Sequence, residues 1–404
     1  MSEKISSVRG GVCAPQGFTA AATHCGIKRV NTTRDDLALV YSEFPATGAG
    51  VFTTNVVKAA PVYLCQKHLR SKQVRAVVLN SGNANACTGT QGDSDAAAMA
   101  ALTGKALSVS EKEVLVCSTG RIGVPLPMQK IESGIAAASK FLAKKNHRAA
   151  ARAIMTSDTV PKEVSIEIKS SQGTYRIGAM AKGAGMINPN MATMLCVVTT
   201  DADIPRVFLK KILAEVVEAT FNRITVDGDM STNDTVLLLA NAQSGVKISP
   251  NDDSDAELFH AGLQHCCTEL ARKIVQDGEG TERVIELEIR TAKTARDARL
   301  AADAAANSIL LKCALAGADP NWGRIVDAVG YSGARFDPRR IDVYYGDVLL
   351  VSQGEPVSGA EVPARRVARK KEFRVVVDLN AGKAGHTVLT TDLTEEYVRL
   401  NLSE

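Results

Sequence analysis

The hydrophobic pattern along this chain changes between two periods. Short β-branched stretches, often with every second position apolar, predict strands; these are 76–79, 114–117, 164–168, 194–200, 235–240, 284–289, 341–345 and 374–379. Alanine-rich stretches with apolar residues three and four positions apart predict helices; these are 93–107, 131–142, 206–219, 257–274 and 296–314. Strands and helices do not alternate strictly, as they do in a doubly wound parallel sheet. The pattern therefore predicts an α+β fold built in stacked layers.

Length and composition narrow the class of protein. A chain of 404 residues is longer than one usual domain, so we expect two packed regions. No run of 18 or more apolar residues occurs, which argues against a transmembrane helix. The net charge of +4 is small for this length and aromatic residues make up only 4%, so neither a membrane surface nor a nucleic-acid platform is expected.

The common signatures of cofactor and metal sites are missing. Gly278-Glu279-Gly280 lacks the third glycine of a dinucleotide fingerprint, and Gly382-Lys383 lacks the remainder of a phosphate-binding loop. The six histidines are scattered and form no zinc or hydrolase motif. The nine cysteines contain no C-x-x-C pair, and we expect Cys266 and Cys267 to be buried apolar side chains in a reducing cytoplasm. We therefore expect no cofactor and no metal.

Four polar, glycine-rich segments stand where apolar strands begin or end. They are 79–89, 118–120, 182–193 and 226–235. Each one alone is compatible with an ordinary turn, but sites are usually built on such loops at strand ends. The segment 118–120 has the hydroxyl and backbone donors that an oxyanion site needs.

Thr193 offers a nucleophile that needs no histidine. It follows Ala192 and a turn rich in Gly, Pro and Asn. If the backbone were cleaved before Thr193, its new α-amine, with a reference pKa of about 7.7–8.0, could take the proton of its own hydroxyl. A threonine at the start of a strand can equally be an ordinary strand residue.

The run from Lys182 to Leu195 resembles the self-cleavage motif of the ornithine acetyltransferases, the ArgJ-type glutamate N-acetyltransferases of arginine biosynthesis. The similarity extends to 80–89, 118–120, 225–235 and 316–324, and so covers almost the whole chain. It implies a layered sandwich of the ArgJ/DmpA type, which is similar to N-terminal-nucleophile enzymes. It also implies cleavage between Ala192 and Thr193 into an α chain of 1–192 and a β chain of 193–404. The β chain would complete the sandwich and add a smaller C-terminal lobe, commonly in an α₂β₂ assembly.

The resemblance further implies an activity and a set of site residues. Thr193 would take the acetyl group of N2-acetylornithine, release ornithine and pass the acetyl group to glutamate in ping-pong fashion, with acetyl-CoA as a possible second donor. Thr119 and Gly120 match the oxyanion-hole pair of the family. The positions that match its substrate-binding residues are Thr156, Lys182, Thr193, Glu279 and Asn401. No nucleic acid, membrane or cofactor is expected to take part, and the location would be the cytoplasm.

Two departures from the family leave alternatives open. Members usually continue further beyond the position of Asn401, and Arg121 stands where an apolar residue is expected. The first departure could alter substrate range and rate, and a charge at Arg121 beside the oxyanion site could alter acyl specificity. The rival hypotheses are an N-terminal-nucleophile amidase or aminopeptidase, which passes the acyl group to water, and a non-catalytic relative that binds amino acids.

Overall fold

A computed structural model describes residues 4–28, 33–188, 194–250 and 253–402. The chain divides into two compact units, and each is interrupted in sequence. The larger unit contains Met1–Gly183, Asn190–Asn222 and Met230–Ala271, and the smaller unit contains Ala184–Pro189, Arg223–Asp229 and Arg272–Glu404. The two units are defined by how the chain packs and do not correspond to the two predicted chains. The division into chains 1–192 and 193–404 stays a prediction.

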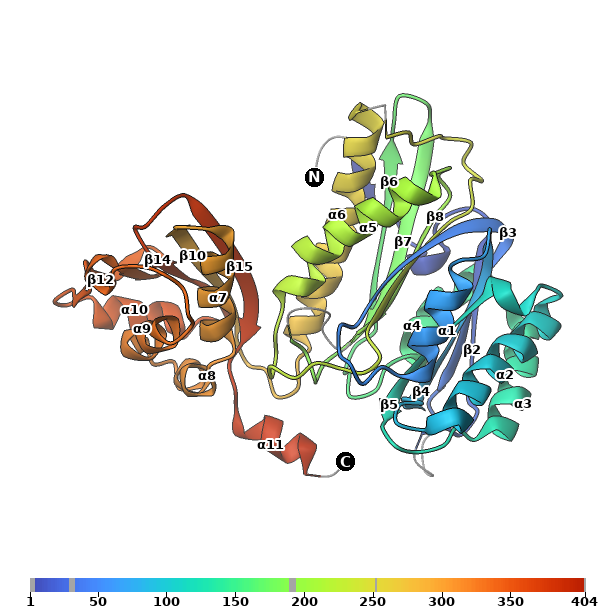
Figure 1. Cartoon of the computed structure of the whole chain (residues 1–404), viewed down its shortest axis with the longest axis horizontal. Helices are drawn as coiled ribbons and strands as arrows, with labels where there is room; N and C mark the ends of the chain where they lie inside the picture. Colours follow the sequence, from blue (N-terminus) through green and yellow to red (C-terminus); the bar gives the residue numbers. More distant parts are fainter. Residues whose placement is uncertain (1–3, 29–32, 189–193, 251–252, 403–404) are drawn as a thin grey trace. The chain divides into compact units, whose positions relative to one another are not determined.

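Two sheets that share one long strand form the centre of the larger unit (Figure 1). The strands are β1 (Ile5–Ser7), β2 (Phe18–Thr23), β3 (Leu37–Phe52), β4 (Val74–Asn83), β5 (Val114–Arg121), β6 (Lys162–Lys169), β7 (Thr174–Lys182), β8 (Leu195–Thr200) and β9 (Thr235–Ala240). The first half of β3 pairs with β2 and β4, and its second half pairs with β9. The strand order is β1-β6-β7-β8-β9-β3-β4-β5, with β2 beside β3.

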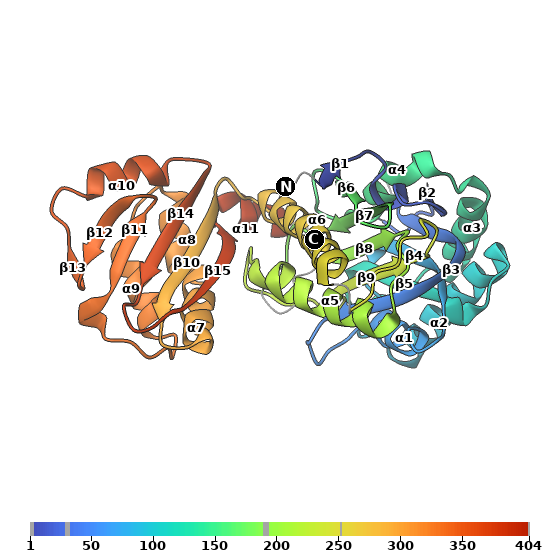
Figure 2. The same cartoon turned by 90° about the horizontal axis from the view of Figure 1, so that it is seen from above.

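Helices pack against these sheets. They are α1 (Ala60–His68), α2 (Gly89–Leu107), α3 (Met128–Ala138), α4 (His147–Ala153), α5 (Arg206–Ala219) and α6 (Asp253–Gln276). In Figures 1 and 2, α5 and α6 lie side by side against the β6–β9 part. The ring of Phe259 from α6 lies 6.1 Å from the ring of Tyr175 on β7, measured between centroids.

Alternation along the strands builds two separate cores. On β4, Val77 and Leu79 belong to a cluster that also contains residues of β8 and β9, while Ala76 and Val78 belong to a cluster with α2 and α3. Successive side chains of a strand point to opposite faces, so β4 serves both cores. The first cluster fills the space between the two sheets. This arrangement confirms the predicted layered α+β fold.

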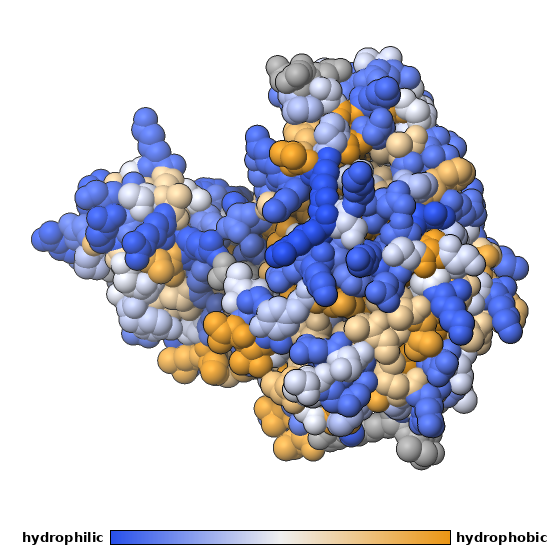
Figure 3. All heavy atoms as spheres, turned by 45° about the vertical axis from the view of Figure 1, so that its right-hand side comes forward, coloured by the Kyte–Doolittle hydropathy of each residue, from blue (hydrophilic) through white to orange (hydrophobic). Residues whose placement is uncertain are grey.

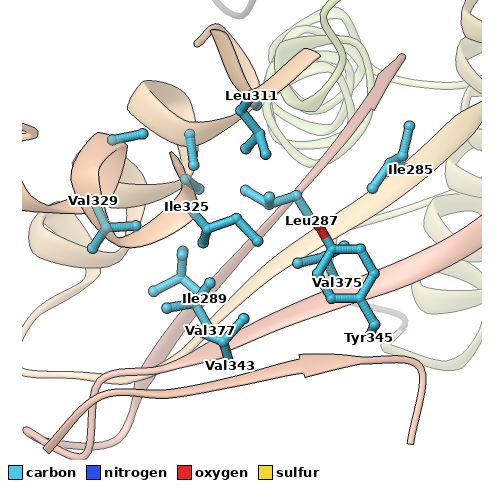
Figure 4. Close-up of a cluster of buried hydrophobic side chains, with 14 of the residues drawn as sticks. Ile285, Leu287, Ile289, Leu311, Ile325, Val329, Val343, Tyr345, Val375 and Val377 are labelled. Carbon is cyan, nitrogen blue, oxygen red and sulfur yellow. The ribbon is translucent and has the colours of Figure 1, made fainter. Parts of the chain in front are cut away.

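The smaller unit packs helices against one mixed sheet. The strands are β10 (Val284–Ala292), β11 (Asp342–Tyr345), β12 (Val348–Ser352), β13 (Glu355–Pro356), β14 (Glu372–Asp378) and β15 (Ala384–Thr391). The helices are α7 (Ala295–Ala306), α8 (Ile309–Ala316), α9 (Trp322–Gly330), α10 (Glu361–Ala368) and α11 (Glu395–Asn401). Figure 4 shows Leu287 and Ile289 of β10 facing Ile325 of α9 in the core of this unit.

Most predicted elements are present, with three corrections to the helices. Residues 93–107 belong to a helix that already begins at Gly89. The helix predicted over 131–142 ends at Ala138. The stretch 296–314 forms two helices, because the chain leaves the first at Asn307 and Ser308 caps the second by accepting the N–H of Leu311.

The polar surface and the unpaired cysteines agree with what the sequence predicts. The face drawn in Figure 3 is mainly hydrophilic, with apolar side chains in small separate groups. Cys266 and Cys267 are fully buried, which confirms their packing role, and all nine cysteines are free thiols. Within the described ranges, no helix has both the length and the apolar composition to cross a membrane.

Candidate functional site

Three neighbouring strands of the larger unit bring predicted site segments to one sheet edge. Lys182, the last residue of β7, pairs with Leu195, the first residue of β8. Leu195 in turn pairs with Thr235, the first residue of β9. Two polar segments that are far apart in sequence, 182–193 and 226–235, therefore join their strands at the same edge.

A buried charge network holds the side chain of Lys182. Its Nζ donates to Thr156 Oγ1 at 2.6 Å and lies 3.8 Å from Asp158 Oδ2. The other carboxylate oxygen of Asp158 accepts from Lys162 Nζ at 2.6 Å and from the N–H of Gly183 at 2.7 Å. Burial alone would raise the pKa of Asp158, but the ammonium groups of Lys182 and Lys162 outweigh it and hold that pKa at about 2. The carboxylate is thus ionised at neutral pH and balances the buried lysines.

The end of β5 presents the predicted oxyanion pair. Thr119 is 5% exposed, and Gly120 has a φ of 132°, which favours glycine. A Cβ atom on Gly120 would lie only 2.3 Å from the carbonyl carbon of Gly82 and 2.5 Å from the nitrogen of Asn83. No side chain fits at position 120, so the backbone of β4 can approach this strand end closely.

Asn233 connects the sheet edge to the end of β5. Its Nδ2 donates to the carbonyl oxygens of Ala84 at 2.6 Å and Ser118 at 2.8 Å. Ser118 directly precedes the Thr119-Gly120 pair, so this amide fixes the backbone beside the predicted oxyanion site. Sequence reasoning identified the segment 226–235 but did not single out Asn233. A buried asparagine in a polar loop gives no signal that separates a bridging role from a turn.

The remaining predicted site residues lie in the smaller unit. Asn401, at the end of α11, donates from Nδ2 to Glu279 Oε2 at 3.0 Å. The N–H of Glu279 donates to the carbonyl oxygen of Ala184 at 3.0 Å. A Cβ atom on Gly185 would lie 2.6 Å from both carboxylate oxygens of Glu279, so this glycine leaves room for the acidic side chain.

The structure thus groups the predicted residues into two sets. Thr119, Gly120, Thr156 and Lys182 belong to the larger unit, and the pair of Glu279 and Asn401 belongs to the smaller one. Ala192 and Thr193, the predicted cleavage site and nucleophile, lie outside the described residues.

The predicted site residues that the structure describes offer charged groups and amide N–H groups. Among those residues, no cluster of three or more His, Cys, Asp or Glu side chains could hold a metal ion. A buried lysine can pair with a carboxylate, a glutamate can pair with an ammonium group, and a strand end can donate N–H groups to an oxyanion. Each of these groups could take part in acyl transfer between amino-acid derivatives.

Comparison with known proteins gives a match over nearly the whole chain. The profile of the ArgJ family matches residues 19–403. The arginine biosynthesis bifunctional protein ArgJ of Symbiobacterium thermophilum is 48% identical over 393 residues, which cover 97% of this chain and 98% of that protein. The glutamate N-acetyltransferase of Methanocaldococcus jannaschii is 45% identical over 406 residues, covering 98% of each chain. The ornithine acetyltransferase of Mycobacterium tuberculosis, solved with ornithine, is 42% identical, covers 47% of this chain and 100% of its own, and has a TM-score of 0.42.

Proposed function

Since this chain belongs to the ArgJ family, we propose that it transfers the acetyl group of N2-acetylornithine to glutamate through an ester on Thr193. It is an ornithine acetyltransferase of arginine biosynthesis, with glutamate N-acetyltransferase activity. The observation that carries the mechanistic proposal is the sheet edge where Lys182, Leu195 and Thr235 are paired. Asn233 ties that edge to the predicted oxyanion strand.

Thr193 becomes the nucleophile after the chain cleaves itself. In this step its hydroxyl adds to the carbonyl carbon of Ala192, and the peptide C–N bond breaks as the nitrogen takes the hydroxyl proton. Water then hydrolyses the resulting ester, which leaves a carboxylate on Ala192 and a free α-amine on Thr193. That amine serves as the base for the hydroxyl in the transfer reaction. The products are an α chain of 1–192 and a β chain of 193–404, which assemble as α₂β₂.

Transfer then takes place in two balanced halves. The Thr193 hydroxyl attacks the acetyl carbonyl, and ornithine leaves with the proton on its amine. The amine of glutamate next attacks the acetyl ester, which yields N-acetylglutamate and restores the hydroxyl. Thr119 and Gly120 donate to the oxyanion in both halves, and loss of one such donor typically lowers the rate ~10²–10³-fold.

The two sets of polar residues recognise the ends of the amino-acid substrates. Lys182, with Thr156 beside it, binds a substrate carboxylate, and Glu279 with Asn401 binds an amine or ammonium group. Acetyl-CoA is a second donor if the enzyme is bifunctional. No resident cofactor, nucleic acid or membrane takes part, and the enzyme works in the cytoplasm.

The mass of the purified protein under denaturing conditions, before and after brief incubation with N2-acetylornithine, tests this function. We expect two chains that separate between Ala192 and Thr193, and an acetyl mass on the β chain alone. Thr193→Ala should stay uncleaved and never gain acetyl, whereas Thr193→Ser should keep part of both reactions because it keeps a hydroxyl. Hydrolysis without acetylglutamate would favour an amidase, and a full-length chain without acetyl would favour a binding protein.

A further inference from the structure

The end of β4, beside the predicted oxyanion pair, has an unusual backbone. Gly82 pairs with Gly120 in the parallel register of β4 and β5. Its φ is 101°, in the region that favours glycine. Both strand ends therefore combine a conformation that most residues avoid with a close approach of two backbones. Such a backbone keeps its geometry only where the surrounding structure holds it.

The segment of residues 25–28 lies against Gly82. A Cβ atom on Gly82 would lie 3.0 Å from both the nitrogen and the Cγ of Lys28, and 3.1 Å from its Cα. A Cβ atom on Gly120 would meet the carbonyl carbon of the same glycine, as described above. Lys28 and Gly120 thus both pack directly on the backbone of Gly82. The segment can fix this glycine only if the segment is itself held in place.

The carboxylate of Asp36 holds the segment 25–28. Its Oδ1 accepts the N–H of Cys25 at 2.6 Å, and its Oδ2 accepts the N–H groups of Ile27 at 2.7 Å and Lys28 at 3.2 Å. Asp36 is fully buried. A buried carboxylate is unfavourable unless hydrogen bonds compensate for its lost hydration, and here three backbone N–H groups of one short segment supply them.

The backbone of Asp36 is bound to β4 as well. Its carbonyl oxygen accepts the N–H of Ser81 at 2.9 Å. Leu37, the next residue, begins β3 and pairs with Asn80. Asp36 therefore binds the residue before Gly82 with its backbone, and the segment that packs on Gly82 with its side chain. All of these residues belong to the larger unit.

We propose that Asp36 is a positioning residue for acetyl transfer, which fixes Gly82 and through it the oxyanion pair Thr119-Gly120. The inference rests on the proposed function. Asp36 binds no substrate in this role. It holds the strand end that presents the oxyanion donors, because donors that are fixed before the reaction stabilise the developing charge best. A displacement of about 1 Å at a reacting centre can lower a rate ~10²-fold.

This role predicts a kinetic signature. The same oxyanion donors serve the acetylation of the enzyme by N2-acetylornithine and the removal of the acetyl group by glutamate. Loss of Asp36 should therefore slow both half-reactions by a similar factor at saturating substrate, while KM changes little. A defect in the binding of one substrate would raise one KM or slow one half-reaction. A merely structural defect would lower the fraction of active enzyme and leave the rate constants of the active fraction unchanged.

Single-turnover kinetics of both half-reactions, followed by the acetyl mass on the protein, test the inference. The amplitude gives the active fraction, and the rate constant does not depend on it. Asp36→Ala should lower both rate constants by about 10–100-fold, up to the lower end of the loss that follows removal of one oxyanion donor. Asp36→Asn should lie between Asp36→Ala and wild type, since one amide oxygen still accepts N–H groups.

Gly82→Ala tests the same contact if Asp36→Ala does not fold. The added Cβ atom would press on Lys28, so both half-reactions should again be slowed together. Gly245→Ala is the matched control, because Gly245 also has a positive φ, 75°, and a Cβ atom there would meet nothing within 4 Å. This variant should lose some stability and keep both wild-type rate constants.

Asp201→Ala is the matched control for Asp36→Ala. Asp201 directly follows β8, is 1% exposed, and accepts the N–H groups of Gln16 at 2.9 Å and Arg176 at 2.7 Å. It should lose stability and keep both rate constants.

Three results would overturn the inference alone. They are wild-type rate constants in Asp36→Ala, or in Gly82→Ala if the first variant does not fold; slowing of only one half-reaction; and equal slowing in Asp201→Ala at a matched melting temperature. A wild-type protein that never forms an acetyl ester would overturn the proposed function and this inference together.

Discussion

Both units bury lysine side chains, but they surround them differently. In the larger unit, Lys162 is fully buried and Lys182 is 3% exposed, and both lie beside the carboxylate of Asp158. In the smaller unit, Lys312 is equally buried and donates to neutral oxygens, namely Thr390 Oγ1 at 3.0 Å and Thr391 Oγ1 at 3.1 Å. Burial lowers the pKa of Lys312 to about 7, against the attraction of Asp392 and Asp227.

The difference shows where the fold maintains a fixed charge. The low pKa of Asp158 means that its negative charge persists through the neutral range and stabilises the adjacent ammonium groups. A substrate carboxylate is bound by a cation, and the negative charge of Asp158 beside Lys182 fits the proposed role of that lysine. The surroundings of Lys312 favour loss of its proton near neutral pH, so it suits packing in the core of its unit better than binding an anion.

The largest effect should follow removal of the carboxylate from the lysine pair. Asp158→Asn removes the ionised carboxylate beside two buried ammonium groups and should lower the free energy of unfolding by about 3–5 kcal/mol. Urea denaturation measures this loss. The double variant Asp158→Asn with Lys162→Met should recover part of it, because one of the stranded charges is also removed. Equal stability of Asp158→Asn and wild type would contradict the charge network.

Acid denaturation tests how much the ionised form of the same carboxylate stabilises the fold. The pKa of Asp158 is lowered from 3.8 to about 2 in the fold, so the stability due to its ionised form is present above pH 3.8 and is lost as the pH falls through about 2. Asp158→Asn should lack this loss.

The helices and strands that form the site could be predicted only in part, because some have a clear sequence pattern and others do not. The apolar run of β9 and the regular spacing of α5 identify these elements with correct bounds. β7 was missed because it needs small residues: a Cβ atom on its Gly178 would lie 2.0 Å from the carbonyl oxygen of Gly11. That close approach removes the β-branched residues on which strand prediction depends. β3 was missed because Pro45, Gly48 and Gly50 interrupt its pattern.

The charged partner of Lys182 could not be predicted from the sequence either. Lys182 could be singled out through its resemblance to the family, but Asp158 stands in a polar stretch that looks like an ordinary turn. Its importance comes from burial beside two lysines, which are 4 and 24 residues away and meet it only in the folded chain. Long-range pairing of this kind leaves no local pattern.

A smaller effect, limited to the kinetics with substrate, should follow removal of the Lys182 ammonium group. Lys182→Met should lower kcat/KM for N2-acetylornithine by about 10–100-fold, chiefly through KM, because a hydrogen bond to a charged group is lost. Steady-state kinetics measure this change. Lys162→Met is the matched control, since it removes the other ammonium beside Asp158 and should reduce stability while KM stays near the wild-type value. If both variants raised KM equally, Lys182 would have no special contact with substrate.

The last prediction concerns the lysine of the other unit and is a slope of stability with pH. Because the pKa of Lys312 falls from 10.5 to about 7 on folding, the unfolded chain binds more protons between these values. Wild-type stability should therefore gain up to about 1.4 kcal/mol per pH unit from this group as the pH rises through that range. Lys312→Met should lack the gain, as shown by melting temperatures between pH 7 and 10. Lys210→Met, which removes an exposed lysine of α5, should keep the wild-type slope. Identical slopes in wild type and Lys312→Met would mean that Lys312 keeps its proton in the fold, and the contrast between the two buried sites would disappear.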